Sequence, residues 1–208
     1  MMGSSAKFWD KIAQKYAAQP IKDEQAYAKK LEITQGYFSP DMSILEIGCG
    51  TGSTAIKHAP HVSQIRAVDV SPKMLEVAHD RAAEAGVSNV TFECSTVEDM
   101  DLKPESYDMA LALSILHLLE DRQTAIQRIF AALKPGGRFV TSTVCVKDGF
   151  GLLGMLIPVM QFIGMAPFVA KFTATELEAD FIKAGFEVEM NTKPGHKGVA
   201  FMVLKKPQ

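Results

Sequence analysis

The chain has 208 residues, of which 47% are hydrophobic and 22% are charged, and its formal net charge is −2. These values are ordinary for one globular domain, and the small net charge excludes a general attraction to nucleic acid. Cys49, Cys94 and Cys145 have no CxxC spacing, so the sequence predicts neither a disulfide framework nor a metal site. Residues 1–5 contain no apolar signal segment. We therefore expect a reduced, cytoplasmic compartment and no nucleic-acid partner.

Two helices are predicted before the first strand, an amphipathic one over residues 7–18 and a second over 23–38. In the first of them, Phe8, Ile12 and Tyr16 recur at helical spacing. Prolines separate the two helices and end the second one, as is typical of helix boundaries. We expect this N-terminal segment to pack against a sheet that begins further along the chain.

A short apolar stretch at 44–47 ends in a glycine-rich turn. The stretch has the length of a strand that is buried on both faces. Gly48, Gly50 and Gly52 then remove every second side chain, which lets the backbone turn tightly and approach a ligand. This pattern predicts a ligand cradle at the carboxyl end of the first strand of an open α/β sheet.

Polar residues around the glycine turn indicate the kind of ligand. Thr51 or Ser53 is expected to cap the following helix, whose N–H groups would face an anionic group. Glu46 would repel a pyrophosphate but suits an ammonium or sulfonium group, and Ser53 stands where a dinucleotide fingerprint has its third glycine. Asp69 ends the second predicted strand, where a ribose diol is bound in related folds. The set fits a nucleoside with a charged amino-acid tail.

The rest of the chain alternates strands with helices, which predicts a parallel sheet covered on both faces. Ser71 and Pro72 start the helix that ends at Gly86. Thr175 is expected to cap the last helix. Further helices are predicted at 51–59, 121–133 and 175–184, and strands at 65–69, 90–94, 107–113, 138–144, 186–190 and 199–204.

Three motifs resemble the class I methyltransferases that use S-adenosylmethionine (SAM): Glu46-Ile47-Gly48-Cys49-Gly50-Thr51-Gly52, Asp69, and Leu133-Lys134-Pro135-Gly136-Gly137. The resemblance extends from about Phe8 to the C-terminus. It implies a doubly wound α/β fold with a seven-stranded, mostly parallel sheet, helices on both faces and a C-terminal antiparallel hairpin. We expect one domain over 1–208, with a helical cap over 1–40.

The resemblance also implies a cofactor site for SAM and for its product S-adenosylhomocysteine. Asp69 would bind both ribose hydroxyls, and Glu46 would act on the methionine ammonium. Many relatives carry Gly-Asp-Ala where Thr96 stands, so the Thr96 hydroxyl and the Val97 N–H are the expected adenine contacts. The residues expected to bind the cofactor are Glu46, Gly48, Cys49, Gly50, Gly52, Asp69, Val70, Met74, Thr96, Val97, Leu113 and Ser114.

The segment after the fourth strand, Leu113-Ser114-Ile115-Leu116-His117, is where donor and acceptor meet in the family. It lacks the Asn/Asp-Pro-Pro-aromatic motif of amino methyltransferases that act on nucleic acids, and the chain has no Pro-Cys pair for cytosine-C5 chemistry. His117 is the candidate general base, because its ordinary pKa lies in the useful range. The alternative is that His117 orders the loop or contacts the cofactor carboxylate.

The acceptor site is expected between the N-terminal cap and an apolar insertion over 148–172. Trp9, Tyr16 and Tyr27 either line this site or only pack a helix onto the sheet. Residues 149–170 carry no charge, but glycines and prolines interrupt them, so we expect no membrane-spanning helix. The alternatives for 149–170 are a lid, a dimer contact and a membrane-surface patch. In a lid, Met155 and Met160 would fit an apolar substrate.

The sequence thus predicts methyl transfer by in-line displacement from SAM to a small, apolar acceptor such as a quinone, phenol, lipid or thiol. This interpretation places the chain near the ubiquinone and menaquinone methyltransferases. The alternatives are a nucleic-acid or protein methyltransferase, a module that binds SAM without catalysis, and a nicotinamide oxidoreductase. The lack of a basic stripe disfavours the first of these, and Glu46 with Ser53 disfavours the last.

Overall fold

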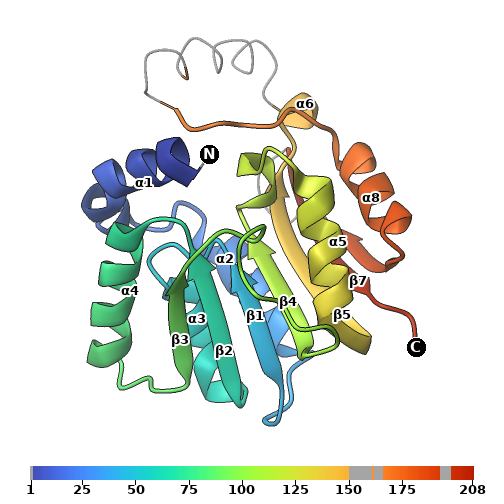
Figure 1. The fold of residues 1–208 in the computed structure, drawn as a ribbon, viewed down its shortest axis with the longest axis horizontal. Coiled ribbons are helices and arrows are strands. Elements are labelled where there is room, and N and C mark those ends of the chain that lie inside the picture. The colour runs from blue at the N-terminus through green and yellow to red at the C-terminus, as the bar shows by residue number, and fades with distance from the viewer. Residues whose placement is uncertain (1, 150–160, 162–165, 193–197) are drawn as a thin grey trace.

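The structure, a computed structural model, describes residues 2–149, 161, 166–192 and 198–208, with side chains from Ser5 onward. Its seven strands form one sheet in the order β3-β2-β1-β4-β5-β7-β6 (Figure 1). The pairs β1–β2, β1–β4, β2–β3 and β4–β5 are parallel, whereas β7 is antiparallel to β5 and β6. The predicted fold class is confirmed. The strands are β1 (Ser43–Ile47), β2 (Gln64–Asp69), β3 (Val90–Cys94), β4 (Tyr107–Leu113), β5 (Leu133–Val144), β6 (Glu187–Thr192) and β7 (Val199–Lys205).

Helices cover both faces of this sheet (Figure 1). Helices α5 and α8 lie over one face, and α2, α3 and α4 lie over the other, each above its own apolar core. The helices are α1 (Met2–Ala17), α2 (Glu24–Gln35), α3 (Ser53–His58), α4 (Pro72–Glu84), α5 (Arg122–Ala132), α6 (Val146–Gly149) and α8 (Ala174–Lys183), with short 3-10 turns η1 (Ala59–His61) and η2 (Leu116–Leu118).

Side chains of β1 alternate between the two cores, because successive residues of a strand point to opposite faces. Leu45 and Ile47 pack in the core below α5 and α8, and Ile44 packs in the core below α2 and α3. Glu46 therefore points to the side of the sheet that α2 and α3 cover. The Glu46 carboxylate is therefore buried on the face of the sheet that carries the second apolar core.

The N-terminus of α3 differs from the prediction. Its N-cap is Gly52, with φ 72°, and none of the side chains that the structure describes caps the helix. Thr51 and Ser53 were expected to do so, but their hydroxyls accept hydrogen bonds from Nη1 of Arg81, at 2.6 and 2.8 Å. A guanidinium that comes from α4 therefore uses the oxygens that would otherwise cap α3.

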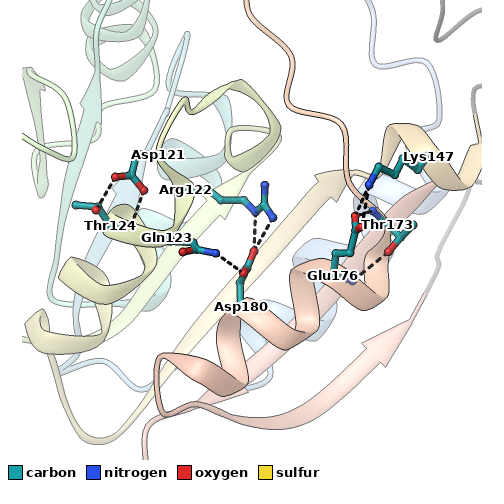
Figure 2. Close-up of polar contacts among 8 residues, drawn as sticks. All are labelled: Asp121, Arg122, Gln123, Thr124, Lys147, Thr173, Glu176 and Asp180. Carbon is teal, nitrogen blue, oxygen red and sulfur yellow. Dashed lines mark hydrogen bonds and ion pairs between the residues drawn. The ribbon is translucent and has the colours of Figure 1, made fainter.

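The predicted N-cap of α4 is correct, and the predicted N-cap of α8 is wrong. Ser71 caps α4 as predicted, since its Oγ accepts the N–H of Met74 at 3.1 Å. In α8 the cap is Thr173 and not Thr175. Thr173 and Glu176 form a reciprocal capping box, in which each side chain accepts the other residue's N–H (Figure 2).

Strand β5 begins earlier than predicted. Helix α5 ends at Ala132, as the following Pro-Gly-Gly predicts, but the chain enters the sheet at once at Leu133. Tyr107 pairs with Leu133 and Met109 pairs with Arg138, so the register shifts between these pairs and β5 contains a bulge. The bulge absorbs the Pro-Gly-Gly segment within the strand.

An ion pair joins α5 to α8 (Figure 2). The Nε and Nη2 of Arg122 lie 2.8 and 2.7 Å from Oδ2 of Asp180, and Nε2 of Gln123 donates to Oδ1 at 2.9 Å. The guanidinium also lies 4.3 Å from the centre of the Phe172 ring. Because the Asp180 side chain is only 10% exposed, this pair is shielded from water better than an ordinary surface pair.

None of the helices within the described residues is long and apolar enough to cross a membrane. Most of the uncharged stretch 149–170, including Met155 and Met160, lies outside the described residues. Its assignment as a lid, dimer contact or membrane-surface patch therefore stays a prediction.

Asp180→Ala is expected to lower the free energy of unfolding by about 1–3 kcal/mol, because it leaves the half-buried Arg122 guanidinium without its carboxylate. Chemical denaturation measures the effect, with Gln127→Ala on the exposed side of α5 as the control that should change stability by under about 0.5 kcal/mol. Equal stabilities of the two variants would contradict this role of the ion pair.

Candidate functional site

The glycine turn after β1 combines close packing with an open position. Gly48, Gly50 and Gly52 all have positive φ values, of 64°, 54° and 72°. A Cβ on Gly48 would lie 2.6 Å from Ile115, and one on Gly52 would lie 2.9 Å from Ala78. A Cβ on Gly50 would have no atom of the described part of the chain within 4 Å. Gly48 and Gly52 thus permit packing, whereas Gly50 presents bare backbone to open space.

Asp69, at the carboxyl end of β2, faces this turn. Its Oδ2 accepts the N–H of Gly50 at 2.8 Å, and its Oδ1 accepts the N–H of Ser71 at 2.9 Å. Burial raises the pKa of Asp69, and these backbone N–H groups act in the opposite direction. The carboxylate is therefore fixed between two loops, with lone pairs left for a ligand.

The first of two adjoining cavities lies beside Asp69. It brings together most of the residues that the sequence predicted for the cofactor. Ser5, Ser95, Ile115, Leu118 and Leu119 also line it and were not predicted. The predicted residues on its wall are Gly48, Gly50, Asp69, Val70, Met74, Thr96, Val97, Leu113 and Ser114, together with Trp9 and Tyr16 from α1.

The second cavity has a volume of about 910 Å³ and lies between α2, α3 and the ends of β1, β4 and β5. Tyr27, Glu46 and Cys49 line it, as predicted for a ligand site. Other wall residues were missed, because nothing local in the sequence marks them: Lys30, His58, Arg81, Ser142 and Val144. Residues shared with the first cavity are Tyr16, Gly48, Gly50, Leu113 and Ser114, so the two form one continuous site.

Glu46 is the most unusual group of this site. Its side chain is 2% exposed, and among the described residues its Oε2 has no hydrogen-bond partner. Burial, with a smaller contribution from the charge of Asp69, raises the pKa of Glu46 to about 8. A buried carboxylate without a partner is costly, so this position favours a cationic ligand.

Helix α1 is bound to the rest of the site at two points. Oδ1 of Asp10 accepts the Ser71 hydroxyl at 2.6 Å and the N–H of Lys73 at 3.1 Å. At the other end of α1, Nη2 of Arg81 donates to the carbonyl of Ala17 at 2.8 Å. These contacts hold the helix that carries Trp9 and Tyr16 against α4 (Figure 1).

Three predicted residues lie elsewhere or act differently. Gly52 lines neither cavity and permits packing against α4. Cys49 lines the second cavity, but burial raises the pKa of its thiol well above the ordinary value, which disfavours a nucleophilic role. His117 lines neither cavity, and burial lowers its pKa to about 4. Its carbonyl accepts the N–H of Ala170 at 2.8 Å, and a base role for it stays a prediction.

Residues 38–183 match the family described as the methyltransferase domain. The chain is 32% identical over 127 residues to the uncharacterized methyltransferase YcgJ of Bacillus subtilis, covering 59% of this chain and 50% of that protein. It is 30% identical over 135 residues to a ubiquinone biosynthesis O-methyltransferase of Idiomarina loihiensis, covering 64% and 54%. The chain spans about half the length of these curated relatives.

A solved structure agrees at the level of the fold. The S-adenosylmethionine dependent methyltransferase from Mesorhizobium loti superposes with a TM-score of 0.73 at 19% identity, covering 88% of this chain and 99% of that one. The family match extends over more than half of the chain and includes β1, the glycine turn and β2. The chain belongs to the methyltransferase domain family.

Proposed function

We propose that this protein transfers the methyl group of SAM to a small, largely apolar acceptor, with a hydroxyl oxygen as the preferred target. The observation that carries the proposal is the buried, unpartnered carboxylate of Glu46 at the wall of a cavity that also contains Asp69 and the glycine turn. Relatives named as O-methyltransferases support the choice of oxygen.

The residues of the site fit SAM. Asp69 would hold the ribose hydroxyls with the lone pairs that Gly50 and Ser71 leave free. Glu46 would pair with the methionine ammonium, which satisfies the orphaned oxygen. Bound in this way, SAM supplies an electrophilic methyl carbon. Thr96 and Val97 lie on the wall of the first cavity, where the adenine would be held.

The remaining work of the protein is positioning and the exclusion of water. Leu113 and Ser114 lie where the two cavities join, and Ser114 has a φ of 65°. The N–H of Ser114 donates to the carbonyl of Ser142 at 2.7 Å, which fixes the end of β4 against β5. A phenol or thiol loses its proton readily, so no strong base is required on this wall.

Asp69→Ala is expected to weaken SAM binding by about tenfold or more, because charged hydrogen bonds to both ribose hydroxyls are lost, each contributing about 1.5–3 kcal/mol. Isothermal titration calorimetry measures this. Asp80→Ala on the exposed side of α4 is the control and should bind SAM like the wild type. Unchanged affinity in Asp69→Ala would remove Asp69 from the site.

Glu46→Gln is expected to change the pH dependence of binding and of stability. Because the pKa of Glu46 is about 8 in the free protein, binding of a cation at pH 7 should release a proton, seen as a calorimetric heat that depends on the buffer. The Gln variant should bind S-adenosylhomocysteine more weakly and release no proton through this group.

Glu46→Gln also tests the direction in which the folding stability changes with pH. The raised pKa means that the folded protein binds more protons than the unfolded chain between pH 4.5 and about 8, so Glu46 makes the ligand-free protein less stable as pH rises through this window. Glu46→Gln should remove that part of the decline and melt at a higher temperature than the wild type above pH 8. Parallel pH–stability curves for the two proteins would contradict the assigned burial of this charge.

A turnover screen tests catalysis itself. Purified protein and SAM are offered phenols, quinones, thiols, amines and lipids, and release of S-adenosylhomocysteine is measured. Release with phenols is the expected result, and Asp69→Ala, which binds SAM more weakly, serves as the matched control with reduced turnover at limiting SAM. Tight SAM binding with no release from any class would favour the binding module without catalysis.

A further inference from the structure

Lys30 lies on the wall of the second cavity, on the helix that covers it. It follows Tyr27 by about one turn of α2, so both side chains face the same way. Its Nζ donates to Oγ of Ser142 on β5 at 2.9 Å, a contact between residues 112 positions apart. Lys30 is half-buried, and burial lowers its pKa.

This ammonium makes no close ion pair. Among the described residues no acid lies within 4.0 Å of Lys30, and the charge of Asp23 acts on it only from further away, raising its pKa against the effect of burial. The segments outside the described residues contain no Asp or Glu. An ammonium has three N–H donors, and the hydroxyl of Ser142 takes one of them. A half-buried cation beside an open cavity is thus left with donors for an anionic ligand.

His58 supplies an independent sign of a missing acceptor on the same cavity. The residue is fully buried on α3, and its Nδ1 lies 3.3 Å from the amide nitrogen of Gln35. Since that amide donates, Nδ1 accepts and Nε2 carries the proton. Among the described residues Nε2 has no hydrogen-bond partner, although the imidazole packs at right angles to the Phe38 ring with the ring centres 4.9 Å apart. The Nε2–H of His58 and the N–H groups of Lys30 that Ser142 does not take are therefore the donors of this wall without an acceptor among the described residues.

The Lys30 contact is well separated from Glu46. Glu46 pairs with Leu111, Leu111 pairs with Val140, and Ser142 lies two residues beyond Val140 towards the carboxyl end. With strands about 4.8 Å apart and a rise of about 3.3 Å per residue, the Cα atoms of Glu46 and Ser142 are roughly 12 Å apart. Both side chains point to the same face of the sheet, by the alternation along each strand.

We propose that Lys30, oriented by Ser142, binds an anionic oxygen group of the methyl acceptor, with a carboxylate as the preferred group. The inference rests on the proposed function, in which Glu46 binds the cofactor ammonium. In SAM the ammonium and the carboxylate are attached to one carbon atom. Because Ser142 holds Lys30 at β5, two strands away from Glu46 on β1, the anion at Lys30 is assigned to the second substrate, and the S-adenosylhomocysteine arm of the test below distinguishes it from the cofactor carboxylate. The acceptor is an apolar molecule with one acidic group.

The test uses protein saturated with S-adenosylhomocysteine and a matched pair of probes, 4-hydroxybenzoate and p-cresol, which differ by a carboxylate in place of a methyl group. Calorimetry should show that the wild type binds 4-hydroxybenzoate at least about tenfold more tightly than p-cresol. Lys30→Met should abolish this preference without changing the affinity for S-adenosylhomocysteine, and Lys30→Arg should retain much of it. Lys29→Met is the matched control, since Lys29 is exposed on the same helix and pairs with Glu32.

Three results would overturn the inference. The wild type could bind both probes equally. Lys30→Met could keep the preference. Lys30→Met could instead weaken S-adenosylhomocysteine binding and leave the probe preference intact, which would assign the anion to the cofactor carboxylate. A wild type that binds no S-adenosylhomocysteine at all would refute the proposed function itself, and this arm is read before any probe is added.

Discussion

The burial of the Glu46 carboxylate is the constraint on which the site depends. Its strand is covered by helices on both faces, so the side chain is placed in a layer where a charge is costly. The low dielectric that raises its pKa to about 8 also strengthens its attraction to a cation that enters the cavity. The ligand-free protein thus holds an unfavourable group whose cost a cationic ligand offsets.

The backbone around Glu46 keeps this group accessible. The positive φ angles of Gly48 and Gly50 turn the chain away from the end of β1, and Asp69 fixes the turn through the N–H of Gly50. Arg81 binds the next residues of the turn and the end of α1 together. The polar contacts therefore connect three segments around one opening.

The sequence predicts the parts of this arrangement that are local. A strand, a glycine turn and the acid at the end of β2 lie in two short segments, and their chemistry is readable from residue order. Neither Thr51 nor Ser53 caps α3, because Arg81 comes from thirty residues away. Thr173 is different, since the capping-box signal T-x-x-E is present in the sequence and identifies the start of α8 better than Thr175 does.

The residues that sequence reasoning missed are those whose roles depend on contacts across the sheet. In the sequence Lys30 resembles any solvent-exposed lysine of a helix, and only the contact with Ser142 on β5 shows that it lines the cavity. Nothing in the sequence distinguishes His58 from the other histidines, and its burial between α2 and α3 depends on the fold. Lys30 and His58 place hydrogen-bond donors on the side of the cavity between α2, α3 and β5, and Glu46 places an acid on the side formed by β1. The two sides of the cavity therefore differ in charge. Such a polarity orients two substrates of different charge in one cavity, because each wall repels the group that the other attracts.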